Sequence, residues 1–118
     1  MSKKLAEILD SARVKEIVEV DTELFNDLLK LYSDQLPKRL QNLRNHFTAG
    51  ERNEVELIVH TLKSSSAQLG ANQLSTLCNE LESQAHTCSI DYFNIQILKI
   101  TQSSEELVTA IENYLKGK

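Results

Sequence analysis

The fold is decided by the stretch DTELFNDLLKLYSDQLPKRLQNLRNHFTAG, residues 21–50. Its apolar residues recur at steps of three and four, which is the spacing of one face of an α-helix. They are Phe25, Leu28, Leu29, Tyr32, Leu36, Leu40, Leu43 and Phe47. Asp21 can cap the start of this helix, and Gly50 can end it. Because the stripe keeps its phase across Pro37, we expect one bent helix over 21–49.

Three further amphipathic segments follow this helix. The first covers 51–69 and ends at Gly70, the second starts with Asn72 as its cap, and the last covers 91–115 after a loop near 86–89. The residues expected to face inward are Val55, Ile58, Val59, Leu62, Ser66 and Leu69, then Leu74, Leu77, Cys78, Leu81 and Ala85, then Phe93, Ile97, Ile100, Leu107, Ile111 and Leu115.

A shorter helix is predicted over 10–18, capped by Asp10, and residues 1–9 either extend it or fray. Three glycines and one proline leave little room for the many tight turns of an all-β fold. Four long helices with short connections predict an antiparallel up-and-down four-helix bundle, with an additional short N-terminal helix. At 118 residues, we expect one all-α domain spanning 1–118.

Composition narrows the functional class. The formal net charge of -4 argues against a nucleic-acid partner, which would favour a basic face. No apolar run is long enough to span a membrane, and the N-terminal residues do not form a secretory signal. We therefore expect a cytoplasmic protein, and the Met1 start with the Lys-Gly-Lys end favours a free one. Cys78 and Cys88 match no zinc spacing and are expected to be reduced and structural.

His60 differs from the other two histidines by its placement. Counting 100° per residue, it points about 150° away from the apolar face of its helix. Its neighbours on the helix surface are Asn53, Glu56, Leu57, Lys63, Ser64 and Ala67. His46 and His86 match no metal-ligand spacing, and no glutamate stands three residues before any histidine, so we expect no metal site.

An exposed imidazole beside a cation suits phosphoryl transfer. A neutral imidazole is a nucleophile near neutral pH, and Lys63 can offset the charge of a phosphoryl group. Small residues after Lys63 leave space for the active site of another protein. Spacing alone leaves a second interpretation open, in which His60 is one histidine on an ordinary solvated helix face.

The segment His60-Thr61-Leu62-Lys63-Ser64-Ser65-Ser66-Ala67-Gln68-Leu69-Gly70-Ala71 resembles the signature of histidine-containing phosphotransfer (HPt) domains. That signature has His, two residues, Lys, Gly or Ser, another Ser, and then a Gly-Ala pair. The resemblance continues through Leu81-Glu82 and the run at 34–40, and extends in order from about Ile8 to Leu115. Ser64 departs from the glycine of many members, but serine is also small and can add a hydroxyl bond to the ring or phosphate.

The resemblance implies a phosphorelay carrier with a four-helix bundle. His60 would accept the phosphoryl group and exchange it with aspartates in receiver domains of hybrid histidine kinases and response regulators. Lys63 is implied to stabilise the phosphohistidine. Glu82 matches a polar position near the histidine, where it either accepts a bond from the ring or is merely solvated.

The resemblance also implies that the chain needs no cofactor of its own, because the receiver supplies Mg²⁺ and the acidic residues. No glycine-rich loop exists to hold ATP, so we expect no kinase activity. We expect a monomer with Leu57, Ala67 and parts of the two N-terminal helices at the rim of its docking surface. The residues expected to bind the partner are Asn53, Glu56, Leu57, Ala67 and Glu82. The alternative is a helical interaction module without phosphotransfer, which the presence of both His60 and Lys63 disfavours.

Overall fold

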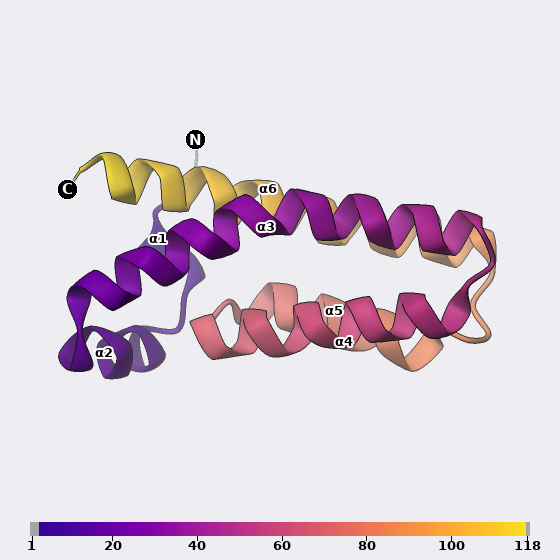
Figure 1. Ribbon diagram of the computed structural model, residues 1–118, viewed down its shortest axis with the longest axis horizontal. Coiled ribbons are helices and arrows are strands. Elements are labelled where there is room, and N and C mark those ends of the chain that lie inside the picture. Colours follow the sequence, from indigo (N-terminus) through magenta and orange to yellow (C-terminus); the bar gives the residue numbers. More distant parts are fainter. Residues whose placement is uncertain (1–2, 118) are drawn as a thin grey trace.

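The computed structural model describes residues 3–117, which form six α-helices and no strand. The helices are α1 (Leu5–Ile8), α2 (Ser11–Val20), α3 (Thr22–Thr48), α4 (Arg52–Leu69), α5 (Asn72–Gln84) and α6 (Ile90–Lys116). The four long helices run up and down in an antiparallel bundle, as predicted (Figure 1). α3 and α6 project beyond the shorter α4–α5 hairpin, and α1 and α2 lie at the projecting end.

The helix ends largely follow the predicted signals. The Asp21 carboxylate accepts a hydrogen bond from the Leu24 amide, and α3 continues through Pro37 without a break. Gly50 and Gly70 both take the positive φ that ends a helix. Asn72 was wrongly predicted as a cap: Ala71 precedes α5, and the Asn72 side chain donates to the Asp10 carboxylate instead.

The N-terminal segment differs from both alternatives given for it. Residues 5–8 form a separate one-turn helix, and the extended backbone of Leu9 separates it from α2. Leu5 and Leu9 are buried, and α1 packs against α6. Burial of two leucines anchors this segment, which therefore neither frays nor extends α2. Residues 1 and 2 lie outside the described part of the chain.

The core contains nearly all the predicted inward-facing residues, with Leu28 as the exception. Leu28 was expected in the stripe of α3, but 40% of it is exposed. Leu28 lines a hollow that also contains Ile17 of α2 and Leu69 of α4, and α2 has no fully buried residue to close over it. Both cysteines are free and buried, and burial raises the pKa of Cys78 to about 12, so its thiol stays neutral. Within residues 3–117, no helix is both long enough and apolar enough to cross a membrane.

Candidate functional site

His60 lies in the middle of α4, on the side of that helix that faces away from the core. The opposite side buries Val55, Val59 and Leu62 against the rest of the bundle. The His60 side chain is 55% exposed, as its helical phase predicted. An incoming group from another protein can therefore reach the ring.

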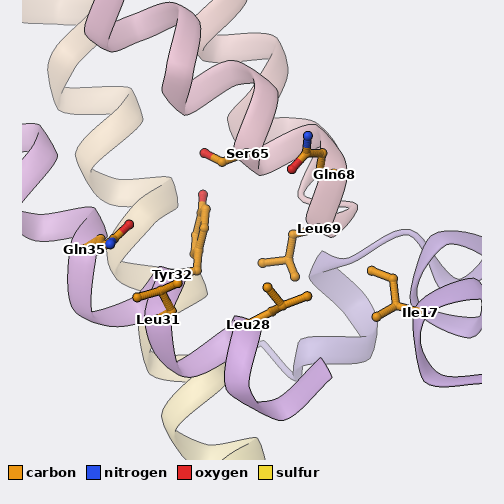
Figure 2. Close-up of a pocket in the computed structure, with 8 residues that line it drawn as sticks. All are labelled: Ile17, Leu28, Leu31, Tyr32, Gln35, Ser65, Gln68 and Leu69. Atoms are coloured by element: carbon orange, nitrogen blue, oxygen red, sulfur yellow. The ribbon is translucent and has the colours of Figure 1, made fainter. Parts of the chain in front are cut away.

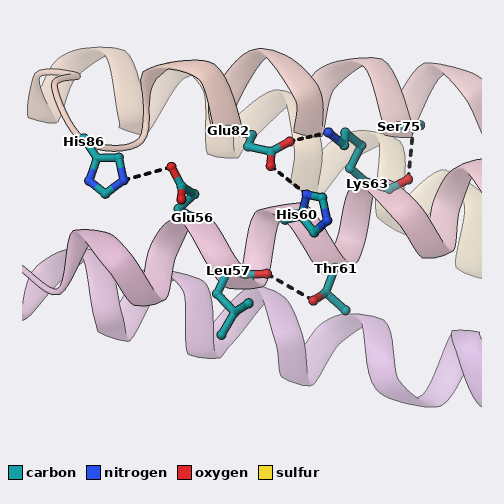
Figure 3. Close-up of polar contacts among 8 residues, drawn as sticks. All are labelled: Glu56, Leu57, His60, Thr61, Lys63, Ser75, Glu82 and His86. Atoms are coloured by element: carbon teal, nitrogen blue, oxygen red, sulfur yellow. Dashed lines mark hydrogen bonds and ion pairs between the residues drawn. The ribbon is translucent and has the colours of Figure 1, made fainter.

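Glu82 of α5 holds the ring in place. Its Oε2 atom lies 2.7 Å from Nδ1 of His60, and its Oε1 accepts a hydrogen bond from the Lys63 ammonium (Figure 3). One carboxylate thus bridges the histidine and the lysine. This geometry decides between the two alternatives left open for Glu82: it accepts a bond from the ring.

The bridge also determines that Glu82 is ionised and which ring nitrogen of neutral His60 carries the hydrogen. The hydrogen bond from Lys63, and after it the bond from His60, lowers the pKa of Glu82 against the opposing effect of burial. Glu82 is therefore a carboxylate at neutral pH and accepts hydrogen bonds only. The ring nitrogen that faces it, Nδ1, must carry the hydrogen, so in the neutral ring Nε2 keeps its lone pair.

The other predicted site residues surround His60 without bonding its ring. Leu57 is 59% exposed and points to the side of α4 opposite Glu82. Asn53 and Ala67 are exposed and lie two turns before and two turns after His60, on the same face of α4. Ser64 is half-buried and lies one turn after His60. Among the described residues, the predicted bond from the Ser64 hydroxyl to the ring is not present.

A second histidine–carboxylate pair lies one helical turn away, and the sequence analysis missed it. The His86 Nε2 atom is 2.8 Å from Oε2 of Glu56 (Figure 3). The sequence signal was the same spacing in two places, Glu-x-x-x-His at 56–60 and at 82–86. In the described part of the chain, no three His, Cys, Asp or Glu side chains are grouped to hold a metal ion.

A family model described as Hpt domain matches residues 27–117, a range that contains all of these site residues. The chain belongs to the Hpt domain family. The match starts inside α3 and continues through α6, so it covers most of α3 and all of α4, α5 and α6 of this Hpt domain.

Two solved structures share the fold. Histidine-containing phosphotransfer protein B from Pseudomonas aeruginosa PAO1 aligns with a TM-score of 0.88 at 21% identity, over 96% of this chain and 98% of that one. The HPT domain of the Hpt sensor hybrid histidine kinase from Shewanella aligns with a TM-score of 0.77 at 18% identity, over 94% and 96%. Among curated proteins, no sequence match was found.

An apolar hollow opens on the other side of α4 of this Hpt domain (Figure 2). It has a volume of about 160 Å³ and is lined by Ile17, Leu28, Leu31, Tyr32, Gln35, Ser65, Gln68 and Leu69. The Tyr32 hydroxyl forms a hydrogen bond of 2.6 Å with Ser66, and burial raises the pKa of Tyr32 to about 12. The α5 side of His60 therefore carries charged groups, whereas most side chains that line the hollow on the α3 side of α4 are apolar.

Proposed function

We propose that this Hpt domain accepts a phosphoryl group on His60 and exchanges it with aspartates of receiver domains in hybrid histidine kinases and response regulators. The observation that carries the proposal is the exposed His60 ring, oriented by Glu82 so that Nε2 is the available nucleophile. Membership of the Hpt family supports a phosphorelay role in general. The direct test is to incubate the chain with phosphorylated receiver domains and to measure an acid-labile, base-stable label on His60.

The proposed transfer involves one bond formed and one bond broken. Nε2 attacks the phosphorus of the receiver's aspartyl phosphate, the P–O bond to the aspartate breaks, and the carboxylate leaves with the electron pair. The hydrogen on Nδ1 stays there, so the phosphorylated ring becomes positively charged beside the Glu82 carboxylate. The reverse attack by an aspartate restores the neutral ring. Mg²⁺ comes with the receiver domain and offsets charge on the transferring group.

Lys63 is placed to stabilise the phosphorylated state. In the unmodified protein its ammonium is bound to Glu82, which also binds His60. A phosphoryl group adds up to two negative charges beside this ammonium, and a long flexible lysine side chain can turn toward them. Lys63 can thus offset the negative charge of the phosphoryl group as this group reaches the ring.

The apolar side of α4 supplies the proposed docking surface for the receiver domain. Leu57 lies beside His60, and the hollow between α2, α3 and α4 begins within two turns of it. Leu28 and Leu31, which line the hollow, are themselves exposed, and exposed Leu24 adds a further apolar side chain on α3. Exposed large apolar side chains beside a polar centre are typical of interaction sites. Asn53 and Ala67 then lie at the rim, on the same face of α4 as His60.

Replacing Lys63 by alanine should lower the rate of phosphoryl acceptance about tenfold, equivalent to about 1.4 kcal/mol of lost transition-state stabilisation. The nucleophile and Glu82 remain, so the loss is partial. The measurement is the initial rate of label transfer from a phosphorylated receiver. A rate equal to that of the unmodified chain would show that the ammonium serves only to hold Glu82.

Replacing Leu57 by glutamate should weaken receiver binding at least about tenfold while leaving the melting temperature nearly unchanged. An exposed side chain contributes little to stability, but a charge at an apolar contact must be desolvated without a partner. The matched control is Leu98→Glu on α6, since Leu98 is 57% exposed. If both variants bind alike, or if Leu57→Glu unfolds the chain, the docking surface is misplaced.

A further inference from the structure

The two histidine–carboxylate pairs between α4 and α5 are crossed. His60 of α4 binds Glu82 of α5, and His86 after α5 binds Glu56 of α4, at 2.7 Å and 2.8 Å. Each histidine therefore bonds the carboxylate of the opposite segment and not the glutamate four residues before it. Figure 3 shows the two pairs side by side where α5 and the turn after it face α4.

The alternative, uncrossed pairing would join Glu56 to His60 within α4. Residues four apart on a helix are neighbours, so a glutamate at this spacing can reach the side chain of the later residue. Glu56 and His60 have this spacing on α4, and both lie on its exposed half. Without another partner, the Glu56 carboxylate would therefore be free to turn to the His60 ring.

His86 is held firmly enough to be such a partner. It lies in the turn after α5, where the Thr87 and Cys88 amides both donate to the Gln84 carbonyl. Arg52, from the first turn of α4, donates to the Ala85 carbonyl at 3.0 Å and so ties this turn to α4. The buried Cys88 side chain fixes the end of the turn. The imidazole is thus presented to Glu56 by a fixed backbone.

We propose that His86 is a positioning residue for phosphoryl transfer: it keeps the Glu56 carboxylate away from His60. The inference rests on the proposed function. A carboxylate at the His60 ring would favour a hydrogen on Nε2 and so remove the lone pair from the nucleophile. It would also repel the incoming phosphoryl group. With Glu56 bound to His86, the ring keeps Glu82 as its single carboxylate partner.

A double-mutant cycle tests this role. In a chain that keeps Glu56, His86→Ala should slow label transfer to His60 about fivefold. This is a size expected for coupling between contacting residues, here His86 and Glu56. In a Glu56→Gln background, the same His86→Ala change should alter the rate less than about twofold. The cycle compares rates within one background, so any effect of Glu56 on docking cancels. His46→Ala is the matched control, because His46 bonds Glu51 at 3.0 Å in a pair that includes neither Glu56 nor His60.

A second measurement needs no phosphoryl transfer. The ¹⁵N signals of the His60 ring report which nitrogen carries the hydrogen, and we expect Nδ1 in the unmodified chain. His86→Ala should shift them toward the other tautomer, and adding Glu56→Gln should reverse the shift. If the unmodified chain takes no label, the proposed function fails, while these signals still test the pairing. Unchanged signals, or a rate loss of the same size in both backgrounds, would overturn the role of His86.

Discussion

Replacing His60 by glutamine is expected to abolish phosphoryl acceptance and leave the fold intact. The side chain is 55% exposed, and substitutions at such positions usually change stability by about 0.5 kcal/mol or less. Glutamine keeps a polar group beside Glu82 but has no nucleophilic ring nitrogen, so no phosphorus–nitrogen bond can form. Label transfer from a phosphorylated receiver measures the first effect, and thermal melting followed by circular dichroism measures the second.

The control for this variant is His46→Gln, which should keep full labelling. Lability separates His60 from the serines that follow it at 64–66. A phosphorus–nitrogen bond breaks in acid and survives in base, whereas phosphoserine survives in acid. Acid-stable label, or label that persists in His60→Gln, would place the modification on another residue.

Replacing Gly70 by alanine should give the largest loss of stability among the single changes considered, about 2–4 kcal/mol. Gly70 has φ +88°, a conformation that L-residues with a side chain avoid. An added Cβ would also lie 3.1 Å from the Asp10 amide nitrogen and 3.2 Å from Cβ of Arg13. That amide donates to the Gly70 carbonyl, so α2 cannot move away without losing the bond. Denaturant unfolding measures the loss.

Gly50→Ala provides the matched comparison. Gly50 has φ +77° but no atom within 4 Å of an added Cβ, so only the backbone strain applies, about 1–2 kcal/mol. The difference between the two variants therefore isolates the crowding under α2. Equal losses would show that α2 moves aside at little cost.

The sequence predicted the helices well because their signals are local. Apolar spacing, Asp10, Asp21 and the two glycines before α4 and α5 each act within a few residues, and the structure follows them. Leu28 fails for a different reason: its exposure depends on how closely α2, α3 and α4 pack around the hollow that it lines. That packing is a property of the assembled bundle and leaves no trace in the spacing of α3.

The features of the site likewise fall into those set by local sequence and those set by how the helices pack. The exposure of His60 follows from helical phase, which is local. The partners of Glu82 and Glu56 depend on the register between two antiparallel helices, and both uncrossed and crossed pairings satisfy the same sequence. The bond from Asn72 to Asp10 likewise joins residues far apart in the chain, so a capping rule could not predict it.

Because the apolar hollow includes the short helix α2, it should resist local unfolding less than the hydrogen-bonded groups around His60 do. The side chains that form hydrogen-bonded pairs around His60 come from α4, from α5 and from the turn after α5. Helices α4 and α5 pack together along their lengths. The apolar hollow also needs Ile17 of α2, a helix with no fully buried residue that is tied to α4 by the Asp10–Gly70 and Arg13–Gln68 hydrogen bonds. Sub-global unfolding that releases α2 would therefore disrupt the proposed docking surface while the hydrogen bonds around His60 remain. We therefore expect destabilisation to weaken the proposed receiver binding before it affects the proposed phosphoryl acceptance at His60.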